Sequence, residues 1–139
     1  LLPIRRGGCP RETMGVLRER LTEDPCTLIV FPEGTRSRTG ELGVFREGVG
    51  MILGGTDVPV VPAHISGAWD CLPPGSRVPR PRRLGIAFGR PMSFPAVAND
   101  RAGWRSIAER MREAVLGVSA SGPNARSAGG SDGARRSEA

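Results

Sequence analysis

The sequence predicts an α/β fold, a layered arrangement in which helices flank a largely parallel or mixed sheet. Short apolar, β-branched runs alternate along the chain with segments whose apolar residues recur at helical spacing. Pro and Gly stand at most junctions between these segments, where they end one element before the next begins. The resulting order is strand, helix, strand, helix, strand, strand, helix, and such alternation is typical of α/β domains.

The first half of the chain is expected to hold a strand, a helix and a second strand. Residues 1–4 have the composition of the end of a strand. Pro10 opens a helix well, because it has no N–H to leave unpaired at the first position. Apolar residues then recur at helical spacing through Leu21, and Pro25 ends the run. The short apolar run at 27–31 predicts a buried strand.

The middle of the chain is expected to hold a short helix and two more strands. Apolar residues in 45–53 recur at i, i+4, i+7 and i+8, and the pair Gly54-Gly55 ends this pattern. Residues 58–65 are apolar and β-branched, which predicts a buried strand. Residues 83–88 are a further strand candidate.

The last helix and a polar tail complete the predicted organisation. The helix begins near Asn99 or Asp100, either of which can cap it. Residues 119–139 contain no large apolar side chain and cannot offset the entropy lost on ordering, which predicts a disordered tail. Residues 1–118 are therefore expected to form the folded part of the chain, and 119–139 the tail.

The net charge of +6 comes entirely from arginine, since the chain has no lysine. Five arginines fall within 77–90 without an acidic residue among them. A solvated loop or a surface that faces anionic lipid headgroups explains such a run. The chain has no Tyr, few aromatic residues to stack on bases, and no helix-turn-helix or zinc-finger pattern, so no nucleic-acid partner is expected.

Three widely spaced cysteines and a single histidine predict no metal site.

The segment 31–37, Phe-Pro-Glu-Gly-Thr-Arg-Ser, has the residue types of a site for a polar ligand and follows the predicted strand at 27–31. Arg36 offers a planar fork of donors that suits a phosphate, and Gly34 allows close approach of the backbone. Glu33 can orient the arginine or accept a bond from a substrate hydroxyl. Thr35 can donate a hydroxyl bond, although turn chemistry explains it equally well.

Arg6 is expected to join this site. It follows the strand predicted at 1–4, and ligands of open α/β sheets gather at the carboxyl ends of strands. Arg6 and Arg36 would then face one phosphate. His64 lies in or just after a predicted buried strand, where a structural role competes with a substrate contact.

The segment 31–37 resembles the phosphate-binding motif of the glycerolipid acyltransferase family. Residues 45–48, Phe-Arg-Glu-Gly, match the downstream element of that family, and residues 58–63, Val-Pro-Val-Val-Pro-Ala, match its later block. Residues 4–6, Ile-Arg-Arg, stand where the family has an earlier arginine motif, with Arg6 as the matching position. The resemblance covers about residues 1–92.

This resemblance implies an O-acyltransferase that moves a fatty acyl group from acyl-CoA or acyl-ACP to 1-acylglycerol-3-phosphate. Arg6 and Arg36 would bind the acceptor phosphate, Glu33 would organise the site, and Gly34 and Thr35 would complete the set of substrate-binding residues. It implies no metal and no cofactor beyond the thioester co-substrate. Two alternatives stay open: a lysophospholipid or lyso-aminolipid acyltransferase, and a non-catalytic basic module that binds a membrane surface.

The chain departs from the family at the catalytic signature, which is Asn-His, four residues, Asp, and precedes every motif named above. Its single histidine, His64, follows the last motif instead, and the next acid, Asp70, is six positions later. We therefore expect a C-terminal part of the domain, truncated at its N-terminus, with no catalytic residue of its own. The resemblance also implies the cytoplasmic face of a membrane, reached peripherally or through an anchor in the missing part.

Overall fold

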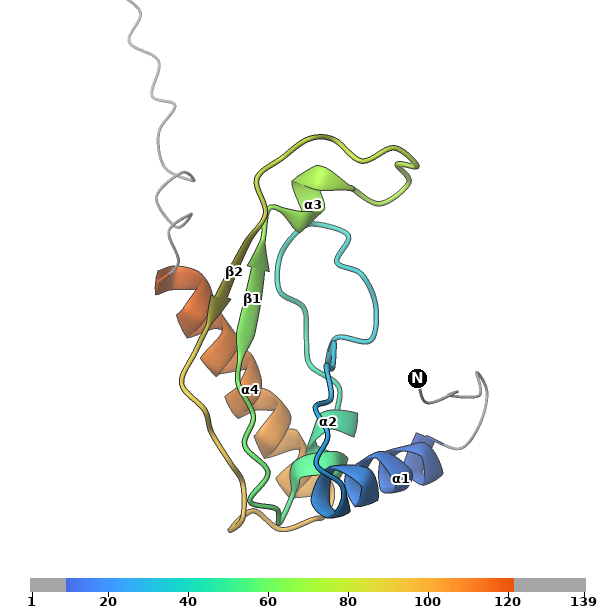
Figure 1. Ribbon diagram of the computed structural model, residues 1–139, viewed down its shortest axis with the longest axis vertical. Coiled ribbons are helices and arrows are strands. Elements are labelled where there is room, and N and C mark those ends of the chain that lie inside the picture. The colour runs from blue at the N-terminus through green and yellow to red at the C-terminus, as the bar shows by residue number, and fades with distance from the viewer. Residues whose placement is uncertain (1–9, 122–139) are drawn as a thin grey trace, which may run out of the picture.

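The structure, a computed structural model, describes residues 10–121 (Figure 1). This part of the chain holds four helices and two strands, in the order α1 (Pro10–Glu23), α2 (Gly48–Leu53), β1 (Ala63–Ser66), α3 (Ala68–Cys71), β2 (Gly85–Phe88) and α4 (Arg101–Ser121). None of the helices in these residues is long and apolar enough to cross a membrane. The described part is thus a mixed α/β structure, as the coarse pattern of the sequence predicts.

The core lies where α1, α2 and α4 meet, at one end of the molecule (Figure 1). Ile107 of α4 and Phe94 of the preceding loop are its most deeply buried side chains, at 0% and 1% exposure. Gly50 of α2 lies directly against the backbone of Trp104 in α4, so a Cβ atom at this position would collide with it. The close crossing of α2 and α4 therefore requires glycine.

Side chains satisfy backbone groups at the start of α4 and at the end of α2. Asp100 Oδ1 accepts a hydrogen bond from the Gly103 N–H at 2.8 Å and caps the start of α4. Asn99, the other predicted cap, accepts instead from the indole N–H of Trp104 at 2.6 Å. Arg18 of α1 donates to the Gly54 carbonyl at 2.5 Å, which satisfies an acceptor at the end of α2.

The three predicted helices are confirmed and differ from the structure only at their boundaries, whereas α3 was not predicted. The helix opened by Pro10 runs to Glu23. The second helix begins at Gly48, later than the predicted Phe45, and ends before Gly54. The last helix runs to Ser121, and so includes the first three residues of the predicted tail. The remaining tail residues, 122–139, lie outside the described residues.

The sheet differs from the prediction. In the described residues it is a two-stranded antiparallel ribbon of β1 and β2, with Ile65 opposite Ile86 and Ala63 opposite Phe88. A largely parallel sheet needs helical crossovers between its strands, whereas α3 and a loop return the chain beside β1 in the opposite direction (Figure 1). The direction of pairing is set by this return path and not by the apolar runs themselves.

The predicted strand at 58–65 is shorter than expected. Val60 forms an isolated bridge to Met92, with N–H to carbonyl distances of 2.8 and 2.9 Å in the two directions. The continuous strand β1 starts only at Ala63. Pro59 and Pro62 have no N–H to donate to a ladder, which explains the interruption.

The segment 27–31 is not a buried strand in the described part of the molecule. Its residues make no ladder hydrogen bonds there. Leu28 packs against the core, while Ile29 and Phe31 are 80% and 72% exposed. The predicted partner strand at 1–4 lies outside the described residues.

Candidate functional site

The candidate phosphate motif lies in a long loop, residues 31–47, between the extended segment at 27–31 and α2. Figure 1 shows this loop running beside the β1–β2 ribbon and reaching α3. The loop opens with a tight turn in which the Gly34 N–H donates to the Phe31 carbonyl at 3.1 Å. Gly34 has φ +68°, a backbone conformation that favours glycine. The turn therefore explains the glycine of the motif.

Glu33 joins the two arms of this loop. Its Oε2 atom accepts a hydrogen bond from the Gly43 N–H at 2.8 Å, and the contact is partly buried. A Cβ atom at Gly43 would come within 2.7 Å of the same oxygen, so the approach depends on glycine. The Glu33 carboxylate thus organises the loop through the backbone of the returning arm.

Arg46 provides a second connection between the arms. Its backbone N–H donates to the Pro32 carbonyl at 2.8 Å, and its Nε–H donates to the Glu33 carbonyl at 3.1 Å. A Cβ atom at Gly34 would approach Arg46 Nε to 2.7 Å. The Arg46 side chain therefore lies across the base of the loop.

The far end of the loop is a turn closed by hydroxyl groups. Ser37 Oγ donates to the Glu41 carbonyl at 2.8 Å and accepts from the Gly40 N–H at 2.9 Å. Gly40 has φ +87° and lies against the ring of Trp69 in α3. Ser37 therefore has the turn role that its residue type predicts.

Arg112 of α4 holds the returning arm of the loop and was not predicted from the sequence. Its Nε–H donates to the Gly43 carbonyl at 2.9 Å, and a terminal N–H donates to the Leu42 carbonyl at 3.3 Å. A signal existed, because Arg112 is four residues after Ala108 and three before Val115. Both are buried, so helical spacing places Arg112 on the inner face of α4.

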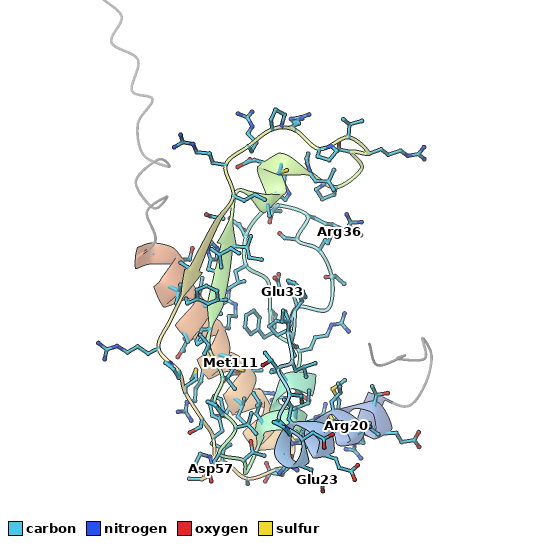
Figure 2. The ribbon with its side chains drawn as sticks, viewed as in Figure 1. Arg20, Glu23, Glu33, Arg36, Asp57 and Met111 are labelled. Carbon is cyan, nitrogen blue, oxygen red and sulfur yellow. The ribbon has the colours of Figure 1, made fainter. Side chains whose placement is uncertain are left out.

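Arg36 is exposed and makes no hydrogen bond or ion pair to any residue that the structure describes. Figure 2 shows Arg36 near the top of the loop and Glu33 lower in it. The structure therefore does not bring the Glu33 carboxylate to the Arg36 guanidinium. Thr35 is also exposed, and Arg6 lies outside the described residues. His64 lies half-buried in β1, opposite Ala87.

Comparison with known proteins identifies the same region. A family model described as Acyltransferase matches residues 2–66. A chloroplastic 1-acyl-sn-glycerol-3-phosphate acyltransferase of Brassica napus is 37% identical over 78 residues, which are 55% of this chain and 22% of that protein. Its Arabidopsis thaliana counterpart is 35% identical over a stretch with the same coverage of both chains. A 1-acyl-sn-glycerol-3-phosphate acyltransferase of Cocos nucifera is 36% identical over 66 residues, 48% of this chain and 21% of that protein.

The chain spans about a fifth of the length of the curated relatives that it matches. No solved structure matches it. The matched residues 2–66 contain the arginine motif at 4–6, the loop motif at 31–37, and the elements at 45–48 and 58–63. Family model, relatives and motif order agree, and they support a glycerolipid acyltransferase family for this part of the chain.

Proposed function

We propose that the loop 31–47 binds the phosphate of a 1-acylglycerol-3-phosphate acceptor in an O-acyltransferase that uses acyl-CoA or acyl-ACP as donor. The observation that carries this proposal is the Arg36 guanidinium, which has no partner among the described residues, on a loop whose two arms are joined by Glu33 and Arg46. A planar guanidinium can donate two parallel hydrogen bonds to phosphate oxygens. Arg36 does not have to leave a partner among residues 10–121 before it binds.

The contacts between the two arms of the loop reduce the entropic cost of ligand binding. A mobile loop loses conformational entropy when it closes on a ligand, and a loop that is already ordered loses less. Contacts from Glu33, Arg46 and Arg112 order the loop before any ligand arrives. Gly34 and Thr35 directly precede Arg36 in the loop, and we propose that they and Arg6 complete the phosphate site.

Glu33 acts in this proposal as a positioning residue and not as an acid or base. Its carboxylate oxygen accepts a hydrogen bond from the Gly43 N–H, and this charge-assisted bond holds the two arms of the loop together. Removal of this carboxylate would displace Arg36 indirectly. This role differs from the two that the sequence suggested, which were a contact with the arginine and a contact with a substrate hydroxyl.

In the proposed reaction the free hydroxyl oxygen of the acceptor attacks the carbonyl carbon of the thioester. An ester C–O bond forms, the C–S bond breaks, and the hydroxyl proton passes to a base and then to the departing thiolate. The Asn-His-x4-Asp signature that supplies this base in the family is absent from these 139 residues. We propose that His64 does not replace it, and that the base is not supplied by this stretch of chain.

The acceptor assignment is supported by the names of the relatives, all three of which are 1-acyl-sn-glycerol-3-phosphate acyltransferases. No observation on this chain favours a lysophospholipid or lyso-aminolipid in its place. An acceptor with fatty acyl chains resides in a bilayer, so we propose that the enzyme works at the cytoplasmic face of a membrane.

The phosphate site can be tested on the 139-residue chain without turnover. We expect sn-glycerol 3-phosphate to perturb the NMR resonances of residues 33–43. Arg36→Gln should weaken this binding by roughly 10- to 150-fold, which corresponds to the 1.5–3 kcal/mol of a charge-assisted hydrogen bond. Arg38→Gln is the matched control, because Arg38 is exposed in the same loop and carries the same charge.

Equal weakening by Arg36→Gln and Arg38→Gln would show that only the general charge of the loop attracts the anion. Unchanged binding in Arg36→Gln would remove Arg36 from the site. Glycerol without phosphate is the ligand control and should produce no perturbation of the loop.

A further inference from the structure

The ribbon of β1 and β2 exposes an apolar face. Exposed and partly buried residues alternate along 61–66 and again along 84–90, as expected of strands covered on one side. α4 contacts both strands and covers the side to which the partly buried residues point. The other side, here named the outer face, consists of Val61, Ala63, Ile65, Leu84, Ile86 and Phe88.

The pairing register makes the outer face continuous. Ile65 lies opposite Ile86, and Ala63 lies opposite Phe88, so the apolar side chains form adjacent cross-strand pairs. Ile86 and Phe88 are 62% and 71% exposed, and no described residue covers them. Contiguous exposed apolar surface of this kind marks a contact with a partner or a membrane.

A strongly basic segment adjoins this face. No acidic residue occurs between Asp70 and Asp100, whereas five arginines do: Arg77, Arg80, Arg82, Arg83 and Arg90. None of their side chains makes a hydrogen bond or ion pair to a residue that the structure describes. By contrast, Arg101 and Arg105 of α4 both pair with Glu47. The arginines around the ribbon are therefore available to an external anion.

The arginines also lie at the limits of the apolar face. Arg82 and Arg83 directly precede Leu84, and Arg90 continues the alternation of exposed residues beyond Phe88. Figure 1 shows the loop before β2 extending past the end of the ribbon, together with α3. Apolar side chains flanked by unpaired cations form an amphipathic surface.

We propose that the outer face and its flanking arginines dock the protein on a lipid bilayer that carries anionic headgroups. Ile86 and Phe88 enter the interfacial region, and Arg82, Arg83 and Arg90 contact lipid phosphates. The proposal deepens the function proposed above, on which it rests for the choice of lipid as the partner.

Charge and composition favour a bilayer over the other occupants. A second copy of this chain would bring the same unpaired arginines face to face, which costs energy because like charges repel. A nucleic acid would leave the aliphatic residues without a partner, since the outer face offers a single aromatic ring, Phe88, for base stacking. An anionic bilayer satisfies both the cations and the apolar side chains.

Docking in this way would bring the phosphate loop to the lipid surface. Gly40, at the far end of the loop, packs against Trp69 of α3. α3 and the basic segment lie at the same end of the ribbon (Figure 1). A lipid acceptor would therefore meet the loop that carries Arg36 without leaving the bilayer surface.

The test is co-sedimentation of the 139-residue chain with vesicles that contain neither phosphatidic nor lysophosphatidic acid. We expect binding to phosphatidylcholine vesicles that contain a minority of phosphatidylglycerol, much weaker binding to phosphatidylcholine alone, and loss of binding as salt is raised. Arg82→Gln/Arg83→Gln should weaken binding about 30-fold, which corresponds to about 1 kcal/mol for each arginine. Arg135→Gln/Arg136→Gln removes the same charge and should leave binding within about twofold of the unmodified chain.

The apolar contribution is tested by Phe88→Asp, which should abolish the binding that remains at moderate salt. Val16→Asp on α1 is its control, because Val16 is also an exposed apolar residue, at 49%, but lies outside the outer face. Circular dichroism should show unchanged helix content in every variant, since all the substituted residues that the structure describes are exposed.

Absence of vesicle binding would overturn the proposal, and so would equal loss in the two double-arginine variants. Preferential binding of duplex nucleic acid, or a concentration-dependent dimer that Phe88→Asp abolishes in the absence of lipid, would also overturn it. Arg36→Gln separates the two proposals. Arg36 lies outside the outer face, so Arg36→Gln should weaken vesicle binding much less than Arg82→Gln/Arg83→Gln does. The double variant should leave glycerol 3-phosphate binding unchanged, so either proposal can fail alone.

Discussion

Glu33→Ala should release the returning arm of the phosphate loop. The Glu33 carboxylate makes one hydrogen bond to a backbone N–H, that of Gly43, at 2.8 Å in a partly buried position. A bond to a charged group contributes about 1.5–3 kcal/mol, and partial exposure places this one near the lower value. A loss of about 1.5 kcal/mol should speed exchange of the Gly43 amide hydrogen roughly tenfold.

Hydrogen exchange followed by NMR measures this effect at the amide concerned. The Val60 amide is an internal control, because it donates to the Met92 carbonyl at 2.8 Å outside the loop. Glu33→Gln keeps an acceptor oxygen without the charge and should give an intermediate exchange rate. Binding of glycerol 3-phosphate to Glu33→Ala should weaken several-fold, because the loop must be ordered on binding.

Two results would refute this reasoning. An unchanged exchange rate at Gly43 in Glu33→Ala would show that the carboxylate does not hold the loop. Equal acceleration at Gly43 and Val60 would show a loss of global stability in place of local release.

Two further predictions concern the packing around the loop and the core. Arg112→Ala removes both hydrogen bonds from α4 to the loop and should also accelerate exchange of the Gly43 amide hydrogen. Arg112→Lys lacks the planar fork and should therefore retain only part of the protection of this amide. Gly50→Ala should lower the free energy of unfolding in urea by about 1–3 kcal/mol or more, because its Cβ would overlap the backbone of Trp104. Gly15→Ala is the control for helix propensity. It should raise the free energy of unfolding by about 0.5–1 kcal/mol, since nothing lies within 4 Å of the Cβ position of residue 15. Similar changes in the two glycine variants would contradict the close helix crossing.

Helices α1, α2 and α4 were predictable because their determinants are local, whereas the short helix α3 was not predicted. The apolar spacing of α4 and the acceptor side chain of Asp100 lie within a few residues of the element that they define. Periodicity could not choose between Asn99 and Asp100 as the cap. The structure decides it, because Trp104 engages the Asn99 side chain.

The sheet was harder to predict because strand pairing joins distant parts of the chain. An apolar run such as 83–88 does not encode the direction in which its partner approaches. The turn through α3 decides that β1 and β2 run antiparallel. Pro59 and Pro62 cannot donate to a ladder, and the strand that they interrupt was predicted too long.

By itself, the sequence indicated the resemblance to the glycerolipid acyltransferases, the helices α1, α2 and α4, and the presence of Arg36 on a loop after an apolar segment, because motifs and periodicity depend on neighbouring residues. Only the tertiary structure decided what holds that loop. The Glu33 bond to Gly43 spans 10 residues, and the Arg112 bond to the same residue spans 69. Contacts of such separation depend on how helices and loops pack in space, and no local pattern of residue types specifies them.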